Sequence, residues 1–214
     1  MPDSVVPPEL EAEPASASDL FGDRVDLARS FANELAVRGE ELGLIGPLEI
    51  PRLWNRHILN CALVAPLLRP GRVGDVGSGA GLPGVVLAIA RPDVQFVLIE
   101  PMERRVDWLT AEAARLGLAN VEVLRARAEE AKVSPRLDQV TARAVSALSK
   151  LIPLTVPLVR SGGELLFLKG ASVGAEMDAA AKVIRRMHLT DVEIVTLGEG
   201  TVPDVTRVFR ATVD

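Results

Sequence analysis

Short apolar runs and amphipathic segments alternate along most of the chain. Seven runs rich in Val, Leu and Ile predict strands, which we place at 72–76, 95–100, 121–124, 139–143, 163–168, 192–197 and 205–211. Segments with apolar residues at helical spacing lie between several of them, at 84–91, 102–117 and 174–188. This alternation predicts an α/β fold with a mostly parallel sheet, and the short connection between the last two strands predicts an antiparallel pair.

A different pattern precedes the first strand. Residues 1–18 contain four prolines and several acids, which predicts a disordered acidic tail. An amphipathic helix is expected at about 19–42, and a second helix at about 51–67. The chain is therefore expected to divide into this tail, a helical extension over 19–70 and a sheet-bearing domain over 71–214.

A glycine-rich stretch connects the first strand to the helix that follows it. Five of the twelve residues 73–84 are glycine. Such a turn lets a ligand approach bare backbone and places it over a helix N-terminus. Glu100 ends the second strand, where it could accept hydrogen bonds from ribose hydroxyls. Glycine turns also occur for tight packing alone, but with Glu100 this stretch predicts a site for an adenosine-type cofactor.

The identity of that cofactor depends on where the strand ends. Gly79 to Gly84 fits the dinucleotide fingerprint, which keeps a nicotinamide-dependent oxidoreductase open. However, the strand ends at Val76, so the fitting window starts two residues late. Asp75 could meet an ammonium group, which suits a cofactor with an amino-acid end and not a pyrophosphate. The run Asp75-Val76-Gly77-Ser78-Gly79-Ala80-Gly81 resembles the glycine motif of class I S-adenosylmethionine-dependent methyltransferases. This resemblance implies a Rossmann-like fold and S-adenosyl-L-methionine as cofactor.

Charge and cysteine content restrict the remaining classes. The net charge is −5, but residues 1–26 alone carry −6, so the rest of the chain is at +1 and charge does not exclude an RNA substrate. Apolar runs are all far shorter than a membrane span of roughly 18 residues. Cys61 is the single cysteine, which fits a reducing cytoplasm, and with two histidines it predicts no metal site.

Polar residues follow five of the predicted parallel strands. They are Asp75, Glu100, Arg127 with Glu129, Arg143 and Lys169. Ligands of such sheets bind outside the carboxyl ends of the strands, so these side chains are candidates for one site. Each taken alone could equally be a solvated loop charge.

Several sequence blocks point to one family. After the glycine motif with its Leu82-Pro83-Gly84 continuation come Arg127-Ala128-Glu129-Glu130, Arg143-Ala144 and Leu168-Lys169-Gly170, and before it comes Arg56-His57-Ile58-Leu59-Asn60. Over about residues 25–211 the chain resembles the bacterial small-subunit ribosomal RNA guanine-N7 methyltransferases, the RsmG or glucose-inhibited-division protein B family. It departs at Asn60 and Cys61, where relatives often have Asp and Ser.

The resemblance implies the roles of individual residues. Gly77, Gly79 and Leu82 would line the methionine and ribose portion of the cofactor, and Glu100 would hold the ribose hydroxyls. Ala128 and Glu129 would frame the adenine, and Arg143 would lie beside the cofactor where the base arrives. Small-subunit ribosomal RNA, or the small ribosomal subunit, would be the partner, and we expect a monomer in the cytoplasm.

The chemistry of such a reaction fits the candidate residues. N7 of guanine carries a lone pair and no proton, so the site must align the reactants and needs no general base. Arg143 and Lys169 are expected to align the base, for example through O6. His57 is a candidate for the same site or an ordinary helix histidine. Phosphate contacts are expected from Arg56, Arg104, Arg105 and Lys150, each of which could instead be surface charge. A small-molecule methyltransferase and a non-enzymatic nucleotide-binding regulator stay open as alternatives.

Overall fold

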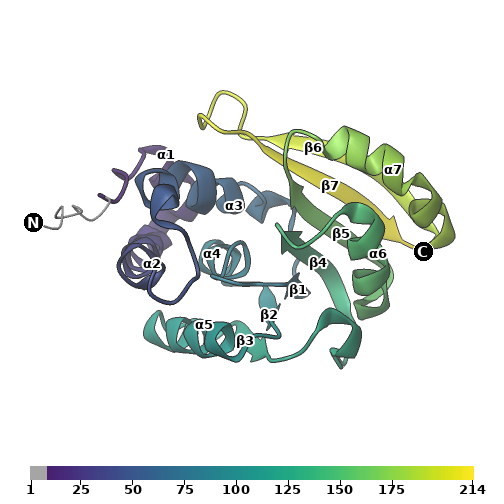
Figure 1. The fold of residues 1–214 in the computed structure, drawn as a ribbon, viewed down its shortest axis with the longest axis horizontal. Coiled ribbons are helices and arrows are strands. Elements are labelled where there is room, and N and C mark those ends of the chain that lie inside the picture. Colours follow the sequence, from purple (N-terminus) through teal and green to yellow (C-terminus); the bar gives the residue numbers. More distant parts are fainter. Residues whose placement is uncertain (1–8) are drawn as a thin grey trace, which may run out of the picture.

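The computed structural model describes residues 9–214, which form one seven-stranded sheet with helices on both faces (Figure 1). The strands are β1 (Arg72–Val76), β2 (Gln95–Ile99), β3 (Val121–Leu124), β4 (Leu137–Arg143), β5 (Val159–Lys169), β6 (Leu189–Leu197) and β7 (Thr206–Val213). Their order is β3-β2-β1-β4-β5-β7-β6. Neighbours from β3 to β5 are parallel, and β7 is antiparallel to both β5 and β6. The predicted mostly parallel sheet with an antiparallel last pair is confirmed.

Both faces of the sheet are apolar because successive side chains of a strand point to opposite sides. In β5, Leu166 and Leu168 pack into one apolar cluster, whereas Leu165 and Phe167 pack into the other. The first face is covered by α4 (Gly84–Ala90) and α5 (Glu103–Arg115), and the second by α6 (Leu148–Thr155) and α7 (Val173–Arg186) (Figure 1). This two-layered burial leaves the carboxyl edge of the parallel strands for the loops that carry the site.

The helical extension is less regular than the sequence predicts. Its helices are α1 (Ser16–Phe21), α2 (Val25–Arg38) and α3 (Asn60–Ala62), with 3₁₀ turns at Gly22–Arg24, Pro47–Arg52 and Ala65–Leu67 and a π-helical turn at Trp54–Leu59. The prediction of two continuous helices is wrong. Gly22 breaks the first with φ +52°, and Pro51 and Pro66 lack the N–H that a regular helix uses. The apolar side chains of the extension join the cluster that contains α4 and α5.

The stretch expected to be a disordered tail falls into two parts. Residues 1–8 lie outside the described residues. The structure departs from the prediction over 9–18, because this segment contacts the extension. The carboxylate of Glu11 accepts the backbone N–H of Asn55 at 3.0 Å, and Ala17 in α1 is fully buried. In the sequence, Glu11 is one of several acids that suggest a disordered tail, but in the fold it has a specific partner, Asn55.

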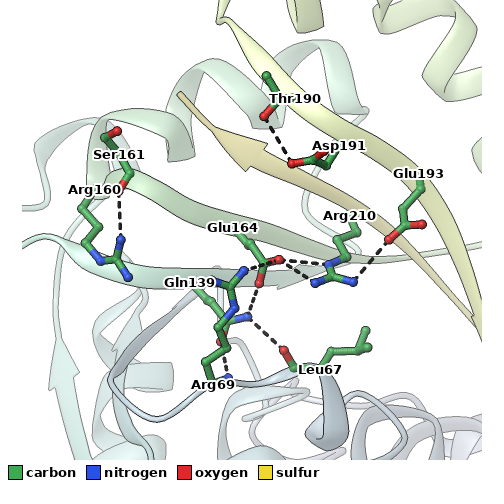
Figure 2. Close-up of polar contacts among 10 residues, drawn as sticks. All are labelled: Leu67, Arg69, Gln139, Arg160, Ser161, Glu164, Thr190, Asp191, Glu193 and Arg210. Carbon is green, nitrogen blue, oxygen red and sulfur yellow. Dashed lines mark hydrogen bonds and ion pairs between the residues drawn. The ribbon is translucent and has the colours of Figure 1, made fainter.

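A buried polar cluster connects the linker before β1 to the amino-terminal half of β4 and the middle of β5 (Figure 2). Glu164 is 2% exposed, accepts a hydrogen bond from Gln139 at 2.7 Å and pairs with Arg210 and Arg69. Gln139 also accepts the backbone N–H of Arg69 and donates to the carbonyl of Leu67. Burial raises the pKa of Glu164, but the hydrogen bonds from its partners outweigh this and lower it. The cluster stabilises the end of the sheet opposite the site.

Two kinds of feature are missing from residues 9–214. No helix is long and apolar enough to cross a membrane, and α2 and α7 have 14 residues each. No group of three or more His, Cys, Asp or Glu side chains is placed to hold a metal ion.

Candidate active site

The turn between β1 and α4 presents bare backbone at the carboxyl edge of the sheet. Gly77, Gly79 and Gly81 have φ of +72°, +55° and +95°, in a backbone region that residues other than glycine rarely adopt. A Cβ on Gly77 would lie 2.8 Å from the side chain of Val145. On Gly79 the nearest atom would be 3.8 Å away, so a side chain there would extend into open space. That space is where a ligand can approach the turn.

Glu100 fixes this turn to the end of β2. Its carboxylate is 2% exposed, and its two oxygens accept the backbone N–H groups of Gly79 and Met102, each at 3.0 Å. A carboxylate has about four lone-pair positions, so each oxygen can accept a further hydrogen bond. Glu100 is therefore able to hold the turn and a ligand hydroxyl at once.

Asp75 is turned into the protein. It is fully buried, and its two oxygens accept hydrogen bonds from the Thr141 hydroxyl and from the backbone N–H of Gly84, each at 3.0 Å. Burial, with a smaller contribution from the charge of Glu100, raises the pKa of Asp75 to about 6 despite these bonds. The sequence predicts contact with a cofactor ammonium group. Asp75 instead links the start of α4 to β4 and is not among the side chains that line the cavities described below.

Two cavities adjoin at this edge and share Gly77, Arg105 and Ala144. The Glu100 cavity measures about 420 Å³ and is lined by, among others, Glu100, Met102, Ala128, Glu129 and Val145. The glycine-turn cavity measures about 230 Å³ and is lined by, among others, Ile45, His57, Gly79 and Leu82. Together they offer a carboxylate for hydroxyl groups, an apolar wall for a flat ring and backbone at the turn. This is the set of groups that an adenosine carrying an amino-acid end requires.

A third cavity lies beyond the ends of β4 and β5. We call it the basic cavity; it measures about 660 Å³, and its charged lining is Arg56, Arg143, Lys169, Glu176, Asp204 and Arg207. It shares Arg143 with the glycine-turn cavity and Val145 with the Glu100 cavity. Ala144 lines all three cavities, and its φ of +54° is unusual for a residue with a side chain. Such backbone outliers concentrate at functional sites.

Arg143 is held by the helical extension. Its guanidinium donates to the Sγ of Cys61 at 3.2 Å, to the carbonyl of Arg56 at 3.1 Å and to Nδ1 of His57 at 2.8 Å. Nε2 of His57 lies 2.7 Å from the carboxylate of Glu49. Burial, followed by the charge of Arg143, lowers the pKa of His57 to about 4. The imidazole is thus neutral at pH 7, with Nδ1 accepting from Arg143 and the Nε2–H donating to Glu49.

Lys169 is also held by protein groups. Its Nζ donates to the carbonyl of Ser146 at 2.7 Å and pairs with Glu176 at 2.7 Å, and its side chain is only 10% exposed. Arg207 lies opposite it in register on β7 and lines the same cavity. Within residues 9–214, Arg207 takes part in none of the ion pairs. The Ser146 hydroxyl is buried at this cavity and has no hydrogen-bond partner in the described part of the chain.

The structure brings nearly all predicted site residues together. The glycine-turn cavity is lined by Gly77, Gly79, Leu82, His57 and Arg143, the Glu100 cavity by Gly77, Glu100, Ala128 and Glu129, and the basic cavity by Arg143 and Lys169. Asp75 is the exception. Sequence reasoning missed Glu49, Val145 and Arg207. Glu49 lies in a turn broken by prolines, where no periodicity connects it to His57, and Val145 and Arg207 have no motif to mark them.

Comparison with known proteins identifies the family. A family model described as GidB, rRNA small subunit methyltransferase G, matches residues 24–204. Similar curated proteins carry the name ribosomal RNA small subunit methyltransferase G. One, from Clavibacter michiganensis subsp. michiganensis, is 65% identical over 213 residues and covers 100% of both chains. Another, from Leifsonia xyli subsp. xyli, is 66% identical over 204 residues, which are 95% of this chain and 98% of the relative.

Solved structures agree on the fold. A tRNA methyltransferase, TrmI, from Aquifex aeolicus superposes with a TM-score of 0.57 at 15% identity, over 72% of this chain and 68% of the other. A methyltransferase from Thiobacillus denitrificans, solved with S-adenosyl-L-homocysteine, gives a TM-score of 0.50 at 15% identity, over 73% and 91%. These superpositions establish the class I methyltransferase fold, and at such low sequence identity they establish nothing beyond the fold. The family model matches most of the chain, and a curated relative is 65% identical to it. The chain therefore belongs to the GidB family, rRNA small subunit methyltransferase G.

Proposed function

We propose that the protein transfers a methyl group from S-adenosyl-L-methionine to N7 of a guanine in small-subunit ribosomal RNA. The observation that carries this proposal is the meeting of three cavities at Ala144. Two of them fit the cofactor, and the third, rich in arginine and lysine, fits a polyanionic acceptor. The names of the curated relatives support ribosomal RNA as the acceptor.

The residues toward the cofactor divide between the two smaller cavities. S-adenosyl-L-methionine supplies a methyl group activated by a sulfonium. We assign the ribose hydroxyls to Glu100, whose oxygens keep acceptor capacity, and the adenine to the wall that includes Ala128 and Glu129. The amino-acid end falls to the glycine-turn cavity with Gly79 and Leu82. Asp75 would act indirectly, by holding the turn in place.

An N7 acceptor suits the groups that surround Arg143. N7 attacks with its lone pair, so nothing must remove a proton, and alignment accounts for the catalysis. His57 has both ring nitrogens engaged, by Arg143 and Glu49, and is not free to act as a base. We propose that His57 and Glu49 position Arg143, which in turn orients the guanine through O6 or a neighbouring phosphate. Lys169 would serve the same base from the other side of the basic cavity, while paired with Glu176.

Two alternatives have less support. A small-molecule methyltransferase would share the cofactor cavities, but the basic cavity, with Arg56, Arg143, Lys169 and Arg207, suits an acceptor with several phosphates. A nicotinamide-dependent oxidoreductase has no support among the relatives, which are named methyltransferases.

The test is methyl transfer from tritiated S-adenosyl-L-methionine to three acceptors: small ribosomal subunits that lack the modification, the free RNA and a small-molecule mixture. Nucleoside analysis of the labelled product should give 7-methylguanosine. Label in another nucleoside would contradict the N7 assignment, and label only in small molecules would support the alternative. Comparison of subunits with free RNA decides which is the substrate.

We also propose that the protein works in the cytoplasm, where its ribosomal substrate lies, and that it does so as a monomer. Light scattering on the purified chain, with and without RNA, tests the monomeric state.

A further inference from the structure

Arg105 occupies a central position between the two cofactor cavities. It lies in the first turn of α5 and lines both the Glu100 cavity and the glycine-turn cavity. Of the charged side chains at this edge, Arg105 alone lines both of these cavities in the described part of the chain. An elongated ligand that spans the two cavities must therefore pass its side chain.

The guanidinium of Arg105 has no protein partner among the residues that the structure describes. Its Nε is buried and has no hydrogen-bond partner among residues 9–214, and Arg105 takes part in none of the ion pairs there. Arg143, which lines the glycine-turn cavity together with Arg105, instead donates to three protein groups. Leaving a buried donor unpaired destabilises a fold, so such a group is retained where something else pairs with it.

The surroundings indicate an anion as that partner. Two acids line these cavities, and within residues 9–214 neither Glu100 nor Glu129 forms an ion pair with Arg105; Glu100 already accepts two backbone N–H groups. The one anionic group of S-adenosyl-L-methionine is the α-carboxylate of its amino-acid end. A guanidinium offers parallel N–H donors in a fork that matches a carboxylate, with Nε as one of the two.

We propose that Arg105 binds the carboxylate of the cofactor and thereby selects ligands that carry the amino-acid end. This inference rests on the proposed function. It assigns to Arg105 a different role from the phosphate contact expected from the sequence.

The test compares two ligands that differ in the amino-acid end. S-adenosylhomocysteine has the carboxylate, whereas 5′-methylthioadenosine has the same adenosine and sulfur without it. Calorimetry on the full chain should show that Arg105→Gln lowers the affinity for S-adenosylhomocysteine about 10- to 100-fold, as expected for one charge-assisted contact. Its affinity for 5′-methylthioadenosine should change less than about twofold. Arg105→Lys keeps the charge without the fork and should fall between wild type and Arg105→Gln.

Arg104 provides a matched control on the same helix. It is exposed and lines a different hollow, with Arg38, Asp107 and Trp108. Arg104→Gln makes the same change of charge one residue away, so both affinities should stay at the wild-type level. A loss as large as that of Arg105→Gln would show a general effect of charge and overturn the assignment.

Other outcomes also decide the matter. Equal losses for the two ligands in Arg105→Gln, or no loss for either, would overturn the carboxylate assignment while leaving the proposed function intact. Should Arg105→Gln fail to fold, Arg105→Lys supplies the measurement: it should bind S-adenosylhomocysteine more weakly than wild type and 5′-methylthioadenosine equally well, and an unchanged affinity for both ligands would overturn the assignment. Wild type that binds no S-adenosylhomocysteine would overturn the proposed function, and this inference with it.

Discussion

Asp75→Asn tests whether the buried carboxylate organises the glycine turn. The substitution preserves shape: the amide oxygen can accept the N–H of Gly84, as Asp75 does now at 3.0 Å. The amide NH₂ can donate to the Thr141 hydroxyl, whose proton then turns to the carbonyl of Gly74, 3.4 Å from the hydroxyl oxygen. Because every polar group keeps a partner, we expect the variant to fold and to differ from wild type mainly in its charge.

The magnitude follows from the pKa of Asp75, which burial raises from 3.8 to about 6. One pKa unit corresponds to about 1.4 kcal/mol, so the ionised form is about 3 kcal/mol less favourable to the fold than the protonated form. The pKa of Asp75 is higher in the folded state than in the unfolded state. The contribution of protonated Asp75 to the free energy of unfolding is therefore fully present below about pH 4 and is lost as the pH rises through about 6. Of the total, about 2 kcal/mol is lost between about pH 4.5 and 8.

The assay is urea unfolding of both proteins across this pH range, followed by fluorescence of Trp54 and Trp108, which are buried. The free energy of unfolding of wild type minus that of the variant should fall by about 2 kcal/mol from about pH 4.5 to 8, since other groups cancel. A difference independent of pH would refute the reasoning.

The same variant separates two roles in binding. Asp75 holds the turn through hydrogen bonds that asparagine can reproduce, so the affinity for S-adenosylhomocysteine should change less than about threefold. A loss of about 100-fold without loss of stability would mean that the carboxylate contacts the cofactor's ammonium group, as the sequence predicts.

The remaining predictions concern the cavities and the N-terminus. Gly79→Val should lower cofactor affinity at least about 100-fold by calorimetry, whereas Gly117→Val, at another glycine with positive φ and open space, should leave it unchanged; equal effects would contradict the role of the turn. Arg143→Ala and Lys169→Ala should each lower turnover about 10- to 100-fold and cofactor affinity much less; a loss that follows the melting temperature would leave both as structural residues. A chain of residues 19–214 should bind the cofactor but melt several degrees lower, because it lacks the buried start of α1; an unchanged melting temperature would contradict this.

Periodicity predicted the sheet well because buried parallel strands have a strong local signal. Phe96 and Leu98 face one apolar cluster and Val97 and Ile99 the other, so the whole run of β2 is apolar and stands out in the sequence. The strong apolar signal of β1 also shows where that strand ends, and the glycine turn begins at the next residue, Gly77. The position of the turn could therefore be predicted from the sequence.

The helical extension could not be predicted from periodicity. Its segments bury apolar side chains such as Trp54 and Ile58, yet they run as π-helical and 3₁₀ turns around prolines. Packing against α4 decides their shape, and local propensity does not report it. The hydrogen bond of Glu11 to Asn55 shows the same limit, because a contact 44 residues apart leaves no local pattern.

The direction in which side chains point at the edge of the sheet is a second feature that the sequence could not predict. Asp75 and Glu100 both mark strand ends, but Asp75 is turned inward by Thr141 on β4, whereas Glu100 lines a cavity. The pairing of β1 with β4 determines this, and the sequence alone does not specify which strands become neighbours. The relay from Glu49 through His57 to Arg143 depends on the same tertiary arrangement.

The central claim is that the cofactor lies across the Glu100 and glycine-turn cavities with its reactive end toward the basic cavity. A crystal structure of the protein with S-adenosylhomocysteine measures this directly. We predict the adenine beside Ala128 and Glu129, the ribose on Glu100, and the sulfur near Arg143, facing the basic cavity. A ligand bound elsewhere, or one whose sulfur faces away from the basic cavity, would contradict the account.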